Sequence, residues 1–207
     1  MPLSPYRQSV DAFLERALKG PPRRGGLCLD VGGGTVRGRW RADTAIDAWT
    51  VIDVRPGPEV DYCVSLKDAP SCLRPRCFDL VKATDVLYLM PEDELVSSLA
   101  AATRLLRPGG ALVATLPFVR PASEIEDQAR WTPWALRQML GIAGFMGWTV
   151  IELGGWWSIL LQLFYDQAYH RHPYRRQLYS RLAPRAREWD RRHPTAWALG
   201  YGVVATT

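Results

Sequence analysis

An acid followed at once by three glycines is the first pattern in the chain that could do chemistry. Asp30 lies in the apolar run 27–31, and Gly32–Gly34 come next. Glycines at the end of a strand let a ligand touch the backbone because no Cβ intervenes, and a following helix would present free N–H groups. Asp30 would repel a pyrophosphate, and Arg37 stands where the dinucleotide fingerprint needs its third glycine. The pattern therefore favours a ligand with a cationic amine.

A second acid, Asp53, lies near the end of the next strand-like run, residues 50–54. An acid at the end of the second strand of an open α/β sheet can accept hydrogen bonds from both hydroxyls of a ribose. Together Asp30 and Asp53 indicate a ligand with a ribose and a positive charge but without phosphates. S-adenosylmethionine has this chemistry, because it combines adenosine, a sulfonium and an amino-acid tail.

Seven apolar, β-branched runs have the length and composition of strands. Between them, apolar residues recur at helical spacing over 6–19 and 92–106, and Thr132 and Pro133 predict the start of a helix over 132–143. The segment 154–195 has no strand pattern and is predicted to form helices inserted before the last strand. This alternation predicts an α/β fold with a doubly wound, mostly parallel sheet. The strand-like runs are 27–31, 50–54, 60–64, 78–83, 110–116, 147–153 and 199–206.

The composition fits one domain of ordinary size. The 207 residues are 47% hydrophobic, enough for a sizeable core. No run of apolar residues is long enough to predict a transmembrane helix, and the first residues include an early acid but no apolar h-region of a signal peptide. We expect a cytoplasmic protein whose four cysteines are reduced.

The net charge of +5 is concentrated in one late segment. Residues 171–192 hold eight arginines against Glu188 and Asp190, a local excess of six that leaves about −1 for the rest of the chain. Such a segment can be a solvated helix face, or it can contact phosphate, nucleic acid or an anionic membrane surface. The sequence leaves these interpretations open.

Five short segments of the chain together resemble the motifs of a known family. They read LDVGGGT, VIDVRPG, FDLVKATDVLYLMPE, LLRPGGALVATLP and RWTPWALRQMLGIAGF. In this order and at these intervals they resemble the class I S-adenosylmethionine-dependent methyltransferases, most closely the small type 11-like group. The resemblance covers residues 25–153 and, more weakly, the last strand. It implies a Rossmann-like seven-stranded sheet with an antiparallel last strand, S-adenosylmethionine as cofactor, and methyl transfer as activity.

The resemblance also implies how the chain is organised. Residues 1–207 would form a single methyltransferase-like domain. Its parts would be an N-terminal helix, a cofactor-binding half, a cap with helices on the acceptor side, and the last strand. These parts correspond to residues 1–24, 25–116, 117–195 and 196–207.

By the same resemblance, the carboxyl ends of the first strands hold the cofactor. Asp30 matches the acid that holds the methionine amine, Asp53 matches the ribose-binding acid, and Val54 is the apolar residue beside adenine. Ser65 stands where the family has an acid for the adenine amine, and Leu66 would supply a backbone N–H to the ring. The implied cofactor-binding residues are Asp30, Gly32, Gly33, Gly34, Asp53, Val54, Ser65, Leu66 and Thr84.

Candidates for catalysis follow the fourth strand-like run. Thr84 and Asp85 lie near where the sulfonium is expected, and a general base is needed only if the acceptor is a hydroxyl or a protonated amine. Asp85 and Tyr88 are the catalytic candidates; alternatively, Asp85 caps the helix near Pro91 and Tyr88 only packs. Tyr88 and Leu89 replace the Glu–His pair of the family's VLEH pattern, so histidine chemistry at that position is excluded.

The insertion carries two further candidate bases, His170 and His172. Their spacing also raises the question of a metal. We predict none, because Arg171 separates the two histidines and no acids cluster near them.

The acceptor should be selected by the segment 117–195, which is rich in tryptophan. Its apolar run near Trp156 and Trp157 has three interpretations: core packing, a hydrophobic substrate pocket, or an interfacial helix whose following arginines touch anionic lipid. The resemblance favours a small-molecule or glycan-linked acceptor. The alternatives are a non-catalytic binding protein with this fold, or a methyltransferase acting on protein or nucleic acid. Nucleic acid is disfavoured, because no NPPY-like motif follows the fourth strand-like run.

Overall fold

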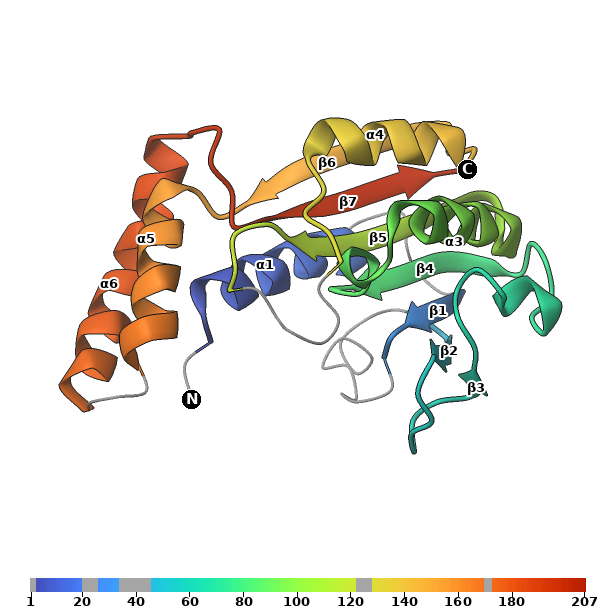
Figure 1. Cartoon of the computed structure of the whole chain (residues 1–207), viewed down its shortest axis with the longest axis horizontal. Helices are drawn as coiled ribbons and strands as arrows, with labels where there is room; N and C mark the ends of the chain where they lie inside the picture. Colours follow the sequence, from blue (N-terminus) through green and yellow to red (C-terminus); the bar gives the residue numbers. More distant parts are fainter. Residues whose placement is uncertain (1–2, 20–25, 34–45, 122–127, 170–172) are drawn as a thin grey trace.

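One sheet organises the molecule, with its strands in the order β3-β2-β1-β4-β5-β7-β6 (Figure 1). The structure is a computed structural model that describes residues 3–19, 26–33, 46–121, 128–169 and 173–207. Neighbouring strands from β3 to β5 pair in parallel, whereas β7 runs antiparallel to both β5 and β6. The strands are β1 (Leu27–Val31), β2 (Ala48–Asp53), β3 (Tyr62–Cys63), β4 (Phe78–Thr84), β5 (Leu106–Pro117), β6 (Gly147–Leu153) and β7 (Gly200–Thr206).

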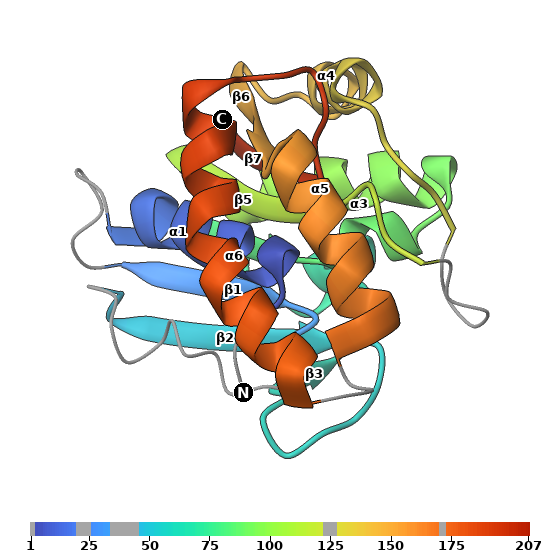
Figure 2. The same ribbon diagram turned by 90° about the vertical axis from the view of Figure 1, so that its left-hand side faces the viewer.

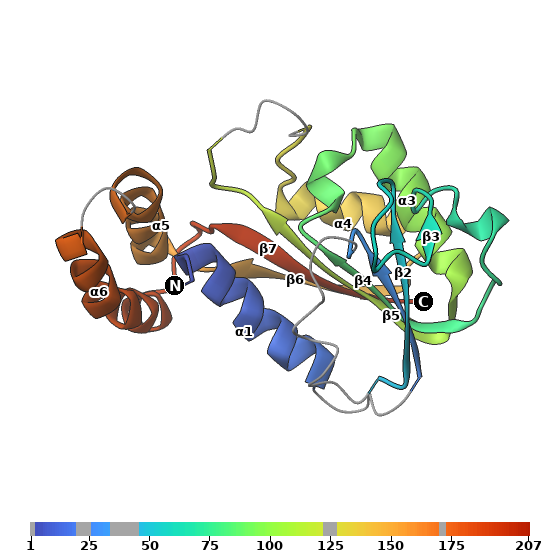
Figure 3. The ribbon, with the colours of Figure 1, turned by 90° about the horizontal axis from the view of Figure 1, so that it is seen from below.

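Helices cover both faces of the sheet. Figure 3 shows α1 (Pro5–Lys19) on one face, with α3 (Glu92–Leu105) and α4 (Pro133–Ile142) on the other. Two short 3₁₀ turns, η1 (Ala69–Ser71) and η2 (Leu87–Leu89), lie in the connections that flank β4. The predicted doubly wound α/β fold with an antiparallel last strand is therefore confirmed.

Side chains that point alternately to the two faces of the sheet form two hydrophobic cores. Cys28, Leu80 and Val113 pack with α1, whereas Leu29, Val81 and Leu112 belong to the larger core on the face of α3 and α4. Because side chains of a strand alternate between faces, strands this apolar throughout must be covered on both sides. The two helical layers meet that requirement.

A helical hairpin stands at one end of the sheet. It consists of α5 (Trp156–Phe164), a π-helical turn η3 (Tyr165–Tyr169) and α6 (Pro173–Arg192). Figure 1 shows the arrowheads of β4 and β5 pointing toward this end, and Figure 2 shows the two helices side by side. The Asp190 carboxylate accepts hydrogen bonds from the N–H groups of Gly155, Trp157 and Ser158 at 2.9–3.1 Å. It thereby caps the N-terminus of α5 and fastens α6 to it.

The predicted strand boundaries agree with the structure to within two residues except at the start of β5, and two of the differences have physical reasons. β3 is shorter than the run 60–64, because the Asp61 carboxylate accepts the Val51 N–H at 2.7 Å, a donor that a backbone carbonyl would take in a longer strand pair. β5 begins at Leu106 rather than at residue 110, since the Pro-Gly-Gly segment continues the strand across a register shift opposite Phe78 and Leu80.

Candidate active site

The turn after β1 depends on glycine. Gly32 has a φ of +72°, its N–H donates to the Ile52 carbonyl at 2.8 Å, and a Cβ there would lie 2.4 Å from Val86. A Cβ on Gly33 would lie 2.7 Å from the Asp30 carboxyl carbon. The backbone of the turn therefore passes directly against the Asp30 carboxyl group. The close approach of a ligand to these glycines stays a prediction. Gly34 lies outside the described residues.

Asp30 is buried and faces a cation of its own chain. The Lys82 Nζ donates to the Asp30 Oδ1 at 2.8 Å, and the two side chains are 8% and 1% exposed. The residues are register partners on the adjacent strands β4 and β1, so their side chains share the face that α1 covers. Sequence analysis missed this pair, although a lysine inside the apolar run 78–83 was a signal, because lysine is rarely buried without a partner.

Asp53 ends β2 beside the glycine turn. Val31 and Ile52 are register partners, which places Gly32 and Asp53 side by side at the carboxyl ends of β1 and β2. The half-buried Asp53 carboxylate accepts the Arg55 N–H at 3.0 Å through Oδ1. Val54 is 67% exposed, so an apolar surface is available next to this acid.

The predicted adenine contacts lie in a tight turn after β3. The Ser65 hydroxyl donates to the Asp68 Oδ2 at 2.6 Å and accepts the Asp68 N–H at 3.3 Å. Its proton is therefore committed within the turn, but a hydroxyl oxygen keeps a second lone pair for a ligand amine. The Leu66 side chain is buried in the core, which leaves only its backbone for a ligand. Asp68 is an acid at this turn that sequence analysis did not single out.

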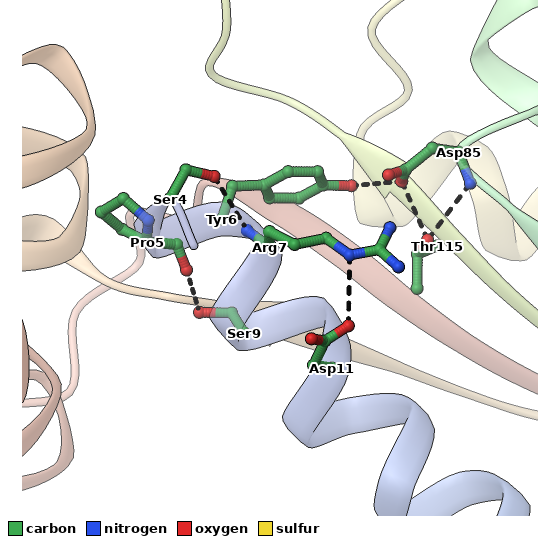
Figure 4. A network of polar contacts seen from close by, with 8 residues as sticks. All are labelled: Ser4, Pro5, Tyr6, Arg7, Ser9, Asp11, Asp85 and Thr115. Atoms are coloured by element: carbon green, nitrogen blue, oxygen red, sulfur yellow. Dashed lines mark hydrogen bonds and ion pairs between the residues drawn. The ribbon is translucent and has the colours of Figure 1, made fainter. Parts of the chain in front are cut away.

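A network of hydroxyls surrounds Asp85 (Figure 4). Its Oδ1 accepts from the Tyr6 hydroxyl at 2.5 Å and from the Thr115 hydroxyl at 2.8 Å, and its N–H donates to the Thr115 carbonyl at 3.0 Å. Asp85 has a φ of +53°, a left-handed conformation that aspartate tolerates better than most residues. The residue before it, Thr84, has a buried hydroxyl with no hydrogen-bond partner among the described residues.

The alternative that Asp85 caps the next helix is wrong. The N-cap position of α3 is Pro91, and the Asp85 carboxylate points to α1 and β5 instead. Tyr6, which comes from α1, is a functional candidate that sequence analysis missed. No spacing in the sequence signals a contact between residues so far apart.

Burial dominates the electrostatics of this network. It raises the pKa of Asp85, while hydrogen bonds from Tyr6 and Thr115 and the charges of Arg7 and Arg120 oppose part of that rise. Burial, and then the Asp85 charge, raise the pKa of Tyr6 far above its ordinary value. Tyr6 therefore keeps its proton and remains a donor to the carboxylate.

Tyr88 lies beneath two arginines. Its buried hydroxyl accepts from the Arg120 Nη1 at 2.8 Å, and the guanidinium carbons of Arg120 and Arg130 lie 5.2 and 5.8 Å from the centre of its ring. Such cation–π contacts hold a guanidinium in place. The predicted catalytic role of Tyr88 stays a prediction, since its hydroxyl here serves as an acceptor for Arg120.

The tryptophans after residue 130 have different surroundings. Trp131 packs on the main core, whereas Trp156 lies 5.5 Å from Trp197 and Trp157 lies 4.9 Å from Trp189, ring centre to ring centre, with all four partly exposed.

The two histidines of the insertion, His170 and His172, lie outside the described residues. Within the described ranges, no three histidine, cysteine or acidic side chains gather as a metal site would require. None of the helices described is long and apolar enough to cross a membrane.

Solved structures of similar fold agree on one architecture. A S-adenosylmethionine-dependent methyltransferase from Archaeoglobus fulgidus has a TM-score of 0.62 and 15% identity, over 97% of this chain and 94% of that one. The 1,6-didemethyltoxoflavin-N1-methyltransferase of Burkholderia thailandensis, solved with S-adenosylhomocysteine, has a TM-score of 0.60 and 16% identity, over 98% of this chain and 78% of that one. This chain has the fold of the class I S-adenosylmethionine-dependent methyltransferases.

The fold leaves the reaction open. The [4+2]-cyclase SpnF is similar to this chain with a TM-score of 0.58 and 24% identity, over 98% of this chain and 81% of that one. A fold of this kind therefore also occurs in a protein named for a cyclisation. The sequence matches no protein-family profile and no curated protein.

Proposed function

We propose that this protein is a methyltransferase that uses S-adenosylmethionine as cofactor and transfers its methyl group in line to a small-molecule or glycan-linked acceptor. The observation that carries the proposal is the edge formed by the ends of β1, β2 and β4. There, a glycine turn with a φ of +72° lies beside Asp53, and the buried hydroxyl of Thr84 has no partner in the described part of the chain. Ligands of open α/β sheets bind at this edge.

The residues at this edge fit the parts of the cofactor. Asp53 would hold the ribose hydroxyls, Val54 would lie against adenine, and the turn Gly32–Gly33 would admit the amino-acid tail close to Asp30. Ser65 and Leu66 would contribute an acceptor and a backbone N–H to the adenine ring, and Thr84 would face the sulfonium. S-adenosylmethionine, when bound, supplies an electrophilic methyl group whose C–S electron pair returns to sulfur.

Asp85 is the residue we assign to proton transfer. Its raised pKa brings a carboxylate closer to the range in which a base works at neutral pH. It holds the proton that a hydroxyl or ammonium acceptor loses, while Tyr6 and Thr115 fix its orientation by donating to Oδ1. The arginine Arg120, held on Tyr88, adds positive charge that would favour an acceptor with an anionic group.

A non-catalytic binding protein is the second candidate function. It is favoured by two contacts, since Asp30 is already paired with Lys82 and the Ser65 proton is already given to Asp68. Such a protein would bind the cofactor but form no S-adenosylhomocysteine with any acceptor.

Titration calorimetry of S-adenosylmethionine and S-adenosylhomocysteine tests the cofactor. We expect saturable binding to wild type, weakened by ~1–3 kcal/mol in Asp53→Ala through the loss of charge-assisted hydrogen bonds. Asp93→Ala removes an exposed acid from the first turn of α3 and should bind like wild type. Absence of binding to wild type at high protein concentration contradicts the proposal.

For location, we propose a cytoplasmic protein that touches anionic membranes through α5 and α6. Trp156, Leu160 and Leu163 give α5 an exposed apolar surface, and α6 beside it presents exposed arginines such as Arg181 and Arg185. Co-sedimentation with phosphatidylglycerol vesicles but not with phosphatidylcholine vesicles is the expected result. Equal recovery of Leu160→Glu/Leu163→Glu and wild type with the anionic vesicles contradicts it.

A further inference from the structure

The buried pair of Asp30 and Lys82 is more than the methyl-transfer reaction requires. Two charged side chains leave water at this point, which costs free energy that their mutual attraction only partly returns. Their place is the carboxyl end of β1, where the Gly33 backbone passes against the Asp30 carboxyl group. The preceding pair of register partners on the same face, Cys28 and Leu80, is apolar. If Asp30 and Lys82 served only to pack the sheet, apolar side chains could take their place in the same way.

The Lys82 ammonium has hydrogen-bonding capacity to spare. An ammonium carries three N–H donors, and Asp30 is its one hydrogen-bond partner among the residues that the structure describes. The group is nevertheless buried, and buried polar groups normally find partners for their donors. An anion brought to this point by a ligand would use the remaining donors.

The ligand that we assign to this edge ends in a zwitterion. The amino-acid tail of S-adenosylmethionine and S-adenosylhomocysteine carries an ammonium and a carboxylate on the same carbon. Asp30 and Lys82 carry the opposite charges in the same close arrangement, with 2.8 Å between Oδ1 and Nζ. A lone Asp30 would attract any amine, whereas the neutral pair attracts only a group that offers both charges.

We propose that Lys82 is a cofactor-specificity residue, which binds the carboxylate of the cofactor's amino-acid tail while Asp30 binds its ammonium. This inference rests on the proposed function, because it requires the cofactor to bind at the ends of β1 and β4. It adds a residue on β4 to the cofactor site and predicts that the site selects zwitterionic ligands over simple amines.

Calorimetry with two ligands tests the inference without any acceptor. The probes are S-adenosylhomocysteine and its analogue that lacks the carboxylate. In wild type, we expect loss of the carboxylate to weaken binding about 10- to 100-fold, the effect of a hydrogen bond between charged groups. In Lys82→Met, the two ligands should bind within about threefold of each other, because the carboxylate no longer has a partner. Equal ligand discrimination in wild type and Lys82→Met overturns the proposal.

Three further variants separate the role of Lys82 from a folding defect. Asp30→Asn/Lys82→Met is uncharged at both positions, so it avoids a lone buried charge, and it should also lose the discrimination. Asp30→Asn keeps Lys82 and should keep the discrimination. Arg107→Met removes a cation that pairs with Asp79 near the start of β4 and should behave like wild type. If wild type binds neither ligand, the proposed function fails; if wild type binds both ligands equally, only the role of Lys82 fails.

Discussion

Two carboxylates lie at the same edge of the sheet, Asp30 buried and Asp85 half-buried, and they differ in what faces them. Asp30 is held by the ammonium of Lys82, whereas Asp85 accepts from the hydroxyls of Tyr6 and Thr115. A cation compensates a buried negative charge directly, but hydroxyls compensate it only in part. The pKa of Asp85 is accordingly raised by burial. The comparison teaches that neighbouring carboxylates can have different partners, an ammonium for Asp30 and hydroxyls for Asp85, and that Asp85 combines its hydroxyl partners with a raised pKa.

Replacing the carboxylate that faces hydroxyls should have the largest effect. Asp85→Asn keeps the size of the side chain and an oxygen for Tyr6 but cannot take a proton. With an acceptor that must be deprotonated, we expect the rate of methyl transfer to fall about 10²- to 10⁴-fold, measured as S-adenosylhomocysteine formed in single turnovers. Cofactor affinity should not change, and a near wild-type rate would remove Asp85 from catalysis.

Breaking the ion pair between Lys82 and Asp30 should have the second-largest effect. Lys82→Met leaves Asp30 buried without its cation, and removal of one partner of a buried pair typically costs ~3–5 kcal/mol of unfolding free energy. Urea denaturation measures the loss. Asp30→Asn/Lys82→Met should recover most of it, because no charge is then buried alone. If Lys82→Met is as stable as wild type, the buried Asp30 carboxylate does not need Lys82 to compensate its charge.

A smaller effect should follow from removing one hydroxyl. Tyr6→Phe takes a donor from Asp85, so the pKa of Asp85 should rise further. The acid limb of the pH–rate profile then moves to higher pH, and the rate at neutral pH falls about tenfold, with recovery in more alkaline buffer. Tyr179→Phe loosens the same N-terminal segment at Leu3 without touching Asp85 and serves as the control. An unshifted profile in Tyr6→Phe contradicts the role of Tyr6.

The smallest expected effect is on stability as a function of pH. Because the pKa of Asp85 is raised above its ordinary value of 3.8 in the folded state, the folded protein keeps this proton to higher pH than the unfolded chain. The contribution of Asp85 to stability therefore falls as pH rises from about 3.8 through the raised pKa, and then becomes constant. Urea denaturation across this range should show the difference between wild type and Asp85→Asn, with the variant relatively more stable at neutral pH.

Features that depend on neighbouring residues in the chain could be predicted from the sequence. The strands β1 and β6 and the cap at Thr132 came from apolar runs and from capping chemistry, and the Thr132 side chain does accept the Ala135 N–H. The turn after β1 was readable because glycine adopts a positive φ most easily and has no Cβ to clash with Val86 at Gly32. These features depend on residues that are near one another in the chain.

The partners of the two carboxylates could not be predicted in the same way. Tyr6 and Asp85 are 79 positions apart, and Lys82 and Asp30 are 52 apart. Their contacts arise from the register of β1 against β4 and from the position of α1 across the sheet, which no local pattern specifies. For Lys82 a clue existed in its apolar surroundings; for Tyr6 there was none.

The position of β7 has a consequence for synthesis on the ribosome. β7 follows β6 in the chain but lies between β5 and β6 in the sheet. Until residues 200–206 have left the exit tunnel, β6 has no strand to pair with. The sheet next to α5 and α6 is therefore incomplete at that stage. The edge from β3 to β5 needs none of these residues for its own pairing, so it can assemble first. Translation thus completes the strand pair β6–β7 and the hairpin of α5 and α6 last.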